Sequence, residues 1–343
     1  MVCVIGEALI DLVMDPASVA SAGPKTYLAH PGGSPFNVAI GLARLSQPSR
    51  LLARLSEDAF GRQLRRHAEA NGVDLSYAVS APESSTVAVV SLDADRNASY
   101  DFYRTGTADW QWRTAELDRM PADTSWIHTG SLASWTEPGA AVIAEQLRRR
   151  RGEQPVVISY DPNIRPALLP DHQAAVDQVE AMVELCDVVK ASAEDLDWLY
   201  PGEDTDNVLR RWQTLGASVV VMTDGGRGAH FLTGKEIGTV PARPVQVVDT
   251  VGAGDAFMAG LINALIAAGY AGTGVAPSVG SAPGSVPPAH SAPDADSAPD
   301  ADSAPDPVAA AVAEAILVAA LTCARAGANP PTAAELAAAQ ASG

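Results

Sequence analysis

The sequence predicts an α/β fold, in which helices flank a mostly parallel central sheet and a small second β-sheet lies beside it. Short β-branched runs recur along the chain and are separated by segments long enough for helices. A glycine or a polar residue follows each run, as at the strand ends where ligands bind in open α/β sheets. One region breaks this alternation with two neighbouring strand-like runs. The 343 residues suffice for one large domain or two.

The central strands are expected at residues 2–5, 156–158, 188–189 and 219–222. The first run is interpreted as a strand because it lacks the basic residues that open a signal peptide. The residues at the strand ends are Gly6, Asp161, Lys190 and Thr223. Because parallel strands end at the same edge of a sheet, we expect the active site along that edge.

Residues 84–104 predict an antiparallel hairpin. Two β-prone runs, 86–92 and 98–103, flank the turn-forming residues 93–97. Together with the chain after Asp11, the hairpin is expected to form the small sheet, from segments 12–31 and 84–109. A sheet beside a strand-end site is a candidate lid, because closure over a substrate excludes water.

Residues 271–307 predict a disordered surface insertion between two helices. They are rich in Pro, Gly, Ala, Ser and Asp, and Ser-Ala-Pro-Asp-Ala-Asp occurs at Ser291 and again at Ser297. Such a composition cannot pack a core, so a tolerated insertion is favoured over a binding motif.

The charge balance argues against a nucleic-acid partner. The chain has 41 Asp and Glu against 23 Lys and Arg, and the resulting formal charge of −18 repels a phosphate backbone. The densest basic run, 148–151, follows an apolar segment and is expected to be a solvated helix end.

Cysteine usage and hydropathy predict a cytoplasmic protein without a membrane span. Cys3, Cys186 and Cys323 are an odd set without CxxC spacing, which fits buried thiols in a reducing compartment. The Ala-rich stretch 308–324 contains Glu314 and falls short of the ~20 apolar residues of a membrane helix.

Residues 249–257 carry the most chemical information. Small residues at 252–254 precede an amphipathic pattern, so a helix is expected to begin near Gly254. Backbone N–H groups at a helix N-terminus bind anions, which makes phosphate the natural ligand. Asp255 is then either a helix cap or a base that takes a proton from a hydroxyl beside the phosphate. The chain has no GxxxxGK[ST], GxSxG or HExxH motif, and Gly252-x-Gly254 lacks the spacing of a dinucleotide fingerprint.

Two segments resemble the signatures of the ribokinase-like (PfkB-type) carbohydrate kinases. One is Gly-Gly-Ser-Pro-Phe-Asn-Val-Ala-Ile-Gly-Leu-Ala-Arg-Leu at 32–45, and the other is Asp-Thr-Val-Gly-Ala-Gly-Asp-Ala-Phe at 249–257. Within the family the chain is most similar to the fructokinases, and supporting matches run from Gly6 to Ala328 without the insertion. The resemblance implies one ribokinase-like domain over 1–343. It also implies transfer of the γ-phosphoryl group of ATP to a primary hydroxyl of a ketose, with fructose as the first choice.

The resemblance assigns roles to individual residues. It makes Asp255 the general base and gives the anion hole to Gly252, Ala253 and Gly254. The expected nucleotide contacts are Lys190, Thr223, Gly225, Gly228, Gly252 and Gly254. The expected sugar contacts are Asp11, Gly32, Gly33, Asn37, Arg104, Asn163 and Asp255. Without the resemblance, Asp11 would be interpreted as a turn residue and Asn37 as a helix cap.

Two arginines extend this set. Arg104 follows Phe-Tyr in a run similar to the lid strand of fructokinases, where the arginine reaches sugar or phosphate; a solvated side chain is the alternative. Arg165 ends Asp-Pro-Asn-Ile-Arg at 161–165, which resembles an element of fructokinases and 2-keto-3-deoxygluconate kinases. The resemblance places this catalytic guanidinium near phosphate, and a structural ion pair is the alternative.

Metal ligands are the least defined part of the expected site. Where many relatives have Asn-x-x-Glu, this chain has Ser192-x-x-Asp195, so Asp195 is expected to reach Mg²⁺ only through water. Asp249 and Thr250 match the loop that holds a monovalent cation in relatives, which makes K⁺ a further candidate.

The expected partners are therefore a small-molecule sugar and ATP, without nucleic acid or membrane, and with a homodimer as a candidate assembly. Two other functions stay open. One is 2-keto-3-deoxygluconate kinase or another sugar kinase of the family. The other is a non-catalytic sugar sensor on the same fold, against which Asp255 argues because binding alone needs no base.

Overall fold

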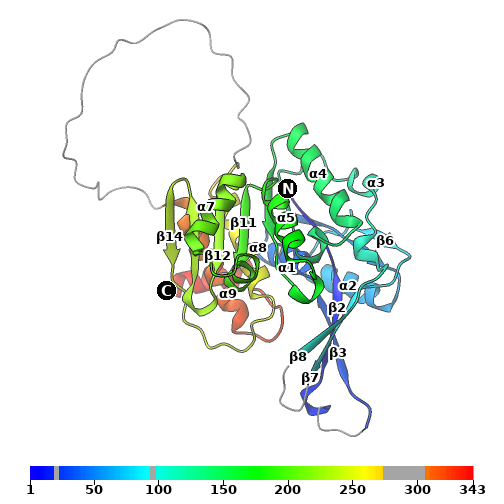
Figure 1. Cartoon of the computed structure of the whole chain (residues 1–343). Coiled ribbons are helices and arrows are strands. Elements are labelled where there is room, and N and C mark those ends of the chain that lie inside the picture. Colours follow the sequence, from blue (N-terminus) through cyan, green and yellow to red (C-terminus); the bar gives the residue numbers. More distant parts are fainter. Residues whose placement is uncertain (19–22, 93–97, 273–305, 343) are drawn as a thin grey trace, which may run out of the picture.

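The computed structural model describes residues 1–18, 23–92, 98–272 and 306–342, and an eight-stranded sheet forms its centre (Figure 1). The strand order is β14-β13-β12-β11-β10-β9-β1-β4. The strands are β1 (Val2–Ile5), β4 (Ser49–Leu52), β9 (Trp126–Gly130), β10 (Val157–Asp161), β11 (Val188–Ser192), β12 (Val219–Thr223), β13 (Ala229–Thr233) and β14 (Glu236–Val240). All neighbours pair in parallel except at β13 and β14, which confirms the predicted sheet.

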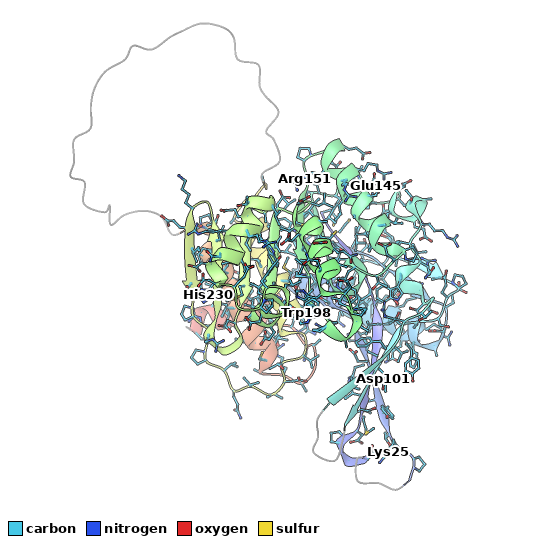
Figure 2. The ribbon with its side chains drawn as sticks, viewed as in Figure 1. Lys25, Asp101, Glu145, Arg151, Trp198 and His230 are labelled. Atoms are coloured by element: carbon cyan, nitrogen blue, oxygen red, sulfur yellow. The ribbon has the colours of Figure 1, made fainter. Side chains whose placement is uncertain are left out.

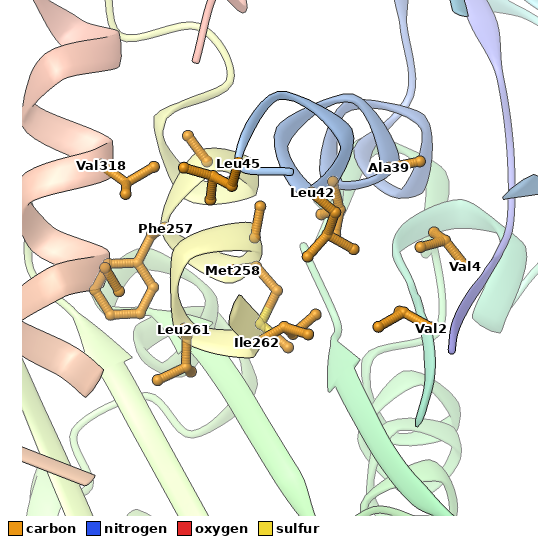
Figure 3. Packing of buried hydrophobic residues seen from close by; sticks show 14 of the residues in the cluster. Val2, Val4, Ala39, Leu42, Leu45, Phe257, Met258, Leu261, Ile262 and Val318 are labelled. Carbon is orange, nitrogen blue, oxygen red and sulfur yellow. The ribbon is translucent and has the colours of Figure 1, made fainter. Parts of the chain in front are cut away.

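Helices cover both faces of this sheet. Because strand side chains alternate, Val2 and Val4 of β1 point into one core and Cys3 and Ile5 into another. The first core includes α1 (Ser34–Arg44), α8 (Ala253–Ala267) and α9 (Pro307–Cys323) and is shown in Figure 3. The second includes α3 (Thr114–Leu117), α4 (Gly139–Glu153), α5 (His172–Val183), α6 (Ala193–Leu199) and α7 (Thr205–Leu215). Strands buried on both faces are typical of parallel sheets.

A second sheet, which we call the small sheet, projects from this body (Figure 1). Its order is β3-β2-β7-β8, from β2 (Leu9–Met14), β3 (Tyr27–Gly32), β7 (Val87–Leu92) and β8 (Ala98–Tyr103). β7 and β8 form the predicted antiparallel hairpin, whose expected turn at 93–97 lies outside the described residues. In Figure 2 the exposed Asp101 of β8 and Lys25, just before β3, mark the place of this sheet.

The remaining elements connect the small sheet to the body or close the chain. They are β5 (Arg54–Ser56), α2 (Ala59–Ala70), β6 (Val79–Ala81) and α10 (Ala333–Ser342). α8 and α9 border the expected insertion at 271–307, of which residues 273–305 lie outside the described part of the chain. None of the described helices is long and apolar enough to cross a membrane.

The expectation of a solvated helix end at 148–151 holds for Arg148, which is exposed near the end of α4, but is wrong for Arg150. Arg150 is buried, and its guanidinium donates hydrogen bonds to the carbonyl oxygens of Met120 and Pro121. Arg151, labelled in Figure 2, pairs with the buried Asp187 at 3.2 Å. The run therefore ties α4 to neighbouring loops instead of facing only solvent.

The cysteine expectation holds for two of the three residues. Cys3 and Cys186 are buried free thiols, whereas Cys323, at the end of α9, is only half-buried.

Candidate active site

The first turns of α1 and α8 meet at the carboxyl edge of the central sheet, through one carboxylate. Asp255 accepts a hydrogen bond from Ser34 Oγ at 2.6 Å on one oxygen and from Asn37 Nδ2 at 2.8 Å on the other. Both donors belong to α1, which begins directly after Gly33. The contact therefore joins the two signature segments, which are more than two hundred residues apart in the sequence.

The position of Asp255 in the helix bears on its two interpretations. The residue lies in the first turn of α8 but makes no side-chain capping hydrogen bond there, because its oxygens accept from Ser34 and Asn37 of α1. Burial raises the pKa of the Asp255 carboxyl, against the lowering effect of the hydrogen bonds from Ser34 and Asn37. A half-buried carboxylate with both oxygens oriented can accept a proton from a ligand placed beside it.

The anion-binding amides stand next to this carboxylate. Gly252 precedes α8 in the left-handed conformation, at φ 74°, and turns the chain into the helix. The N–H of Ala253 donates to the carbonyl oxygen of Thr250 at 3.2 Å. The N–H groups of Gly254 and Asp255 have no acceptor among the described residues. The N–H of Gly252 also has no acceptor there, so the free donors include two residues of the predicted hole at 252–254 and extend to Asp255, and with the helix N-terminus they suit an anion.

A buried ion pair lies beneath these amides. Lys190 is 4% exposed, and its Nζ lies 2.8 Å from Oδ2 of Asp161. Lys190 stands within β11, not at its end as the short predicted strand placed it. Burial disfavours the Lys190 charge, but the carboxylates around it, Asp161 first among them, outweigh this effect and raise its pKa. The ammonium therefore stays charged.

The expected sugar contacts gather where the small sheet joins the body. Asp11 lies within β2, so its interpretation as a turn residue is wrong. Its carboxylate sits over Gly32, where an added Cβ would lie 2.3 Å from Asp11 Oδ2. Burial raises the pKa of Asp11 to about 6, against the positive charge of Arg165. Asn37 lies inside α1 and is no cap, and its amide group is committed to Asp255.

Arg165 is held by its own loop. Its guanidinium donates to Asn163 Oδ1 at 2.7 Å and to the carbonyl oxygen of Ile164 at 2.9 Å. Asn163 and Ser131 both have positive φ, 43° and 53°, and the Asn163 amide lies 3.5 Å from Ser131 Oγ. No salt bridge of Arg165 occurs within the described ranges, so the alternative of a structural ion pair finds no support.

Arg104 follows β8 and is half-buried. Its carbonyl oxygen accepts a hydrogen bond from Trp110 Nε1 at 3.0 Å, which fixes the backbone there. Its guanidinium makes no hydrogen bond to the part of the chain that the structure describes, so the side chain is available to a ligand.

Gly225 and Gly228, two of the expected nucleotide contacts, have different surroundings. Thr223 ends β12, and Gly225 follows at φ 49° with open space where a Cβ would lie. Gly228 instead packs against β14, because its Cβ would lie 2.1 Å from the carbonyl oxygen of Val240. Gly225 therefore leaves its backbone open to a ligand, and Gly228 serves close packing.

The expected metal ligands are already engaged. Asp195 accepts the backbone N–H groups of Ile164 at 2.8 Å and Ser192 at 2.9 Å, one on each oxygen. Asp249 does the same for Val251 and Gly327, at 3.0 and 2.8 Å. Among the described residues, no group of three His, Cys, Asp or Glu side chains is placed to hold a metal ion. The side chains of Asp195 and Asp249 stabilise their loops by accepting these backbone hydrogen bonds.

Three site residues were not assigned from the sequence. Ser34 lies inside the first signature, and Asp161 opens the Asp-Pro-Asn-Ile-Arg element, but neither motif assigned these residues a role in the site. Ser131 follows β9 and carries no motif. A carboxylate at the end of one predicted strand and a lysine directly after the next predicted strand would have pointed to the Asp161–Lys190 pair.

Known proteins resemble this chain over most of its length. A family model described as pfkB family carbohydrate kinase matches residues 1–285. A fructokinase of Rhizobium leguminosarum bv. trifolii is 37% identical over 265 residues, which cover 77% of this chain and 79% of that protein. A fructokinase of Klebsiella pneumoniae is 33% identical over 271 residues, 78% of this chain and 84% of that protein.

Solved structures resemble the whole chain. The fructokinase with bound ATP from Xylella fastidiosa has a TM-score of 0.81 at 27% identity, covering 100% of this chain and 99% of that one. A fructokinase double mutant from Vibrio cholerae O395, with fructose, ADP and potassium ion bound, has a TM-score of 0.76 at 26% identity and covers 99% and 97%.

Proposed function

The chain belongs to the pfkB family of carbohydrate kinases, and we propose that it is an ATP-dependent fructokinase with Asp255 as its general base. The observation that carries this proposal is the Asp255 carboxylate, held by Ser34 and Asn37 directly beside the unpaired amides of α8. The relatives support the substrate: two fructokinases are 37% and 33% identical to this chain over the aligned residues, and the Vibrio cholerae protein binds fructose and ADP.

The residues suit an in-line transfer. Asp255 takes the proton of a primary hydroxyl of fructose, and the hydroxyl oxygen forms a bond to the γ-phosphorus. The bond from that phosphorus to the bridging oxygen breaks, and ADP leaves with its electron pair. The N–H groups of Gly254 and Asp255 and the helix N-terminus stabilise the negative charge on the transferred group.

The side chains expected to bind the ions already accept backbone hydrogen bonds, so they support the ion sites less directly than they support the transfer. Mg²⁺ bound to the ATP phosphates would neutralise part of their charge, and Asp195 would reach it through water because both its oxygens already accept amides. K⁺ would lie at the loop of Asp249 and Thr250, on backbone carbonyl oxygens. The potassium ion bound by the Vibrio cholerae protein supports K⁺ as the candidate cation.

The small sheet supplies the sugar end of the site. Asp11, Arg104, Asn163 and the Gly32-Gly33 pair would contact the hydroxyls, and Arg165 would face the phosphate. Closure of the small sheet as a lid would exclude water from the transfer. A homodimer and a cytoplasmic location stay predictions.

A coupled ADP-release assay tests the function. With MgATP, we expect fructose to give the highest kcat/KM among ketoses, aldoses, nucleosides and 2-keto-3-deoxygluconate. A preference of about tenfold for a nucleoside or for the sugar acid would contradict the fructose assignment. Calorimetric binding of fructose without ADP release from any sugar would instead support a sensor.

A further inference from the structure

One buried carboxylate lies where the small sheet joins the body. Asp109, in the short 3-10 helix η2 (Ala108–Trp110), is 1% exposed and accepts a hydrogen bond on each oxygen. The N–H of Ala8 donates to Oδ1 at 2.9 Å, and the hydroxyl of Thr86 donates to Oδ2 at 2.5 Å. The Thr86 hydroxyl also lies 2.6 Å from the Thr107 hydroxyl. Asp109 therefore holds three segments of the chain, directly or through one hydroxyl.

These three segments are connections between the body and the small sheet. Ala8 lies between β1 and β2, Thr86 precedes β7, and Thr107 follows β8. The N–H of Ile10 in β2 donates to the carbonyl oxygen of Thr86 at 3.1 Å, which joins β2 to the start of β7 beside the carboxylate. The ends of β2, β7 and β8 that meet the body thus converge on one side chain.

The helix that carries Asp109 is fixed to the body. Arg54 of β5 is 2% exposed, and its guanidinium donates a hydrogen bond to the carbonyl oxygen of Ala108 at 3.2 Å. Trp110 is buried in the second core, and its indole N–H donates to the carbonyl oxygen of Arg104. A side chain on such a well-packed segment can serve as a fixed point for the more exposed small sheet.

Two of the expected sugar contacts lie close to these hydrogen bonds along the chain. Asp11 lies in β2, shortly after Ala8. Arg104 lies shortly before Thr107, whose hydroxyl is 3.0 Å from the Arg104 carbonyl oxygen. The carboxylate of Asp255, in contrast, belongs to the body, on α8. The hydrogen bonds to η2 therefore determine where two sugar contacts lie relative to the proposed base.

Stability alone explains a carboxyl group at this position poorly. Burial raises the pKa of Asp109 to about 6, against the lowering effect of the hydrogen bonds from Thr86 and Ala8. The group is thus mostly ionised at neutral pH and accepts on both oxygens. A buried charge costs desolvation energy that a neutral residue would avoid, and such costly groups are typical of functional sites.

We propose that Asp109 is a positioning residue, which holds the near end of the small sheet in place relative to the body. Asp11 and Arg104 then face the sugar at a fixed distance from Asp255. The inference rests on the proposed kinase function. Asp109 is itself buried, so it acts through these two residues and through the chain segments that carry them.

Asp109→Ala removes both hydrogen bonds. We expect the KM for fructose to rise about tenfold or more, because small displacements of positioning groups are costly. The KM for MgATP should change by less than about threefold, since the expected nucleotide contacts lie elsewhere. A KM for fructose within about threefold of the parent would overturn the proposal.

Asp187→Ala is the matched control for a merely structural loss. Asp187 is also 1% exposed and accepts a backbone N–H, from Ile158 at 2.9 Å. It precedes β11, at the end of the central sheet opposite to the site. This variant should lower the melting temperature and leave the KM for fructose unchanged. A rise in KM equal to that of Asp109→Ala would show that lost stability alone explains both.

Two milder variants keep the test valid if Asp109→Ala does not fold. Asp109→Asn keeps the side-chain volume and one acceptor oxygen, so its KM for fructose should stay within about threefold of the parent. Thr86→Val removes one hydroxyl and keeps the β-branched shape, and we expect its KM for fructose to rise about fivefold. An unchanged KM in Thr86→Val would contradict the proposal.

A double-mutant cycle shows whether Asp109 acts through the sugar contacts. Once Asp11→Asn has weakened one contact, its displacement should matter less. We expect the KM of Asp11→Asn/Asp109→Ala to be about fivefold or more below the product of the two single effects. Effects that multiply in full would mean that Asp109 does not act through Asp11.

Hydrogen exchange supplies a readout that does not depend on turnover. The N–H of Ile10 bonds to Thr86 and not to Asp109 itself. We expect it to exchange about tenfold faster in Asp109→Ala than in the parent or in Asp187→Ala, and equal rates would rule out the proposed hold on the small sheet. If the wild-type protein releases no ADP with fructose, the proposed function fails, and these exchange rates still decide the role of Asp109.

Discussion

The proposed phosphate half and sugar half of the site are alike in one respect, because in each a glycine leaves space for a charged side chain. They differ in how well the sheet beside them is covered. At the phosphate half, Gly254 leaves space for the Lys190 ammonium, and at the sugar half, Gly32 leaves space for the Asp11 carboxylate. The first pair joins α8 to β11 of the central sheet, which helices cover on both faces. The second lies on the small sheet, where Leu28 and Tyr103 are 52% and 65% exposed.

This contrast relates stability to chemistry. Charge stabilisation requires fixed groups in a site that excludes water, and the well-packed central sheet provides them. Sugar entry requires an edge that can open, and elements with few buried contacts open at low cost in free energy. Changes in the phosphate half should therefore lower kcat, and changes in the sugar half should raise KM.

Asp255→Asn should give the largest effect, because it removes the base and keeps the side-chain volume. We expect kcat to fall about 10²- to 10⁴-fold, with calorimetric affinities for ATP and fructose changed much less. Asp206→Asn makes the same exchange in the first turn of α7, outside the site, and should leave kcat intact. A kcat for Asp255→Asn within about threefold of the parent would show that Asp255 is not the general base.

Asp11→Asn should affect the other parameter. An amide is a weaker acceptor than a carboxylate, and hydrogen bonds to charged groups contribute about 1.5–3 kcal/mol. We expect the KM for fructose to rise about 10- to 100-fold, with a smaller change in kcat. Asp101→Asn, exposed on β8 of the same sheet, is the control. A loss confined to kcat would break the division between the two halves.

The pH dependence of KM sharpens the same division. Burial raises the pKa of Asp11 to about 6, so the carboxylate that is proposed to accept sugar hydroxyls is lost as the pH falls through that value. The KM for fructose should therefore be constant above about pH 7 and rise below pH 6. Steady-state kinetics at saturating MgATP measures it, and Asp11→Asn should flatten the profile. A profile that stays unchanged in this variant would assign the titration to another group.

The smallest effect is expected from a change that touches neither half. Replacing residues 273–305 with a short Gly/Ser linker should leave kcat and KM unchanged, because their composition offers little apolar surface to bury. Loop-closure entropy changes slowly with length, so the melting temperature should shift by no more than about 2 °C. Loss of folding or activity would give this segment a role.

Local patterns predicted much of the fold. β-Branched runs placed β1, β10, β11 and β12, since such residues favour buried strands. Turn-forming residues between two such runs predicted the hairpin of β7 and β8, and small residues before an amphipathic pattern predicted the start of α8. In each case the signal lies within a few residues of the element.

What the sequence left unassigned depends on contacts between distant segments. Neither Ser34 nor Asn37 shows from its own surroundings that Asp255 will be its partner, because that contact depends on how α1 and α8 pack. The Asp161–Lys190 pair likewise depends on the neighbouring positions of β10 and β11. Arg150 was misjudged because the orientation of α4 decides which side of a basic run is buried.

The contact between Ser34 and Asp255 also orders events during protein synthesis. The two residues are 221 positions apart, so the ribosome completes α1 and the small sheet long before it reaches the base and the anion-binding amides. A nascent chain at that stage thus has Ser34 and the small sheet but not the Asp255 carboxylate and the amides of α8. An unfinished copy that ends before residue 255 therefore lacks the base that the proposed transfer requires.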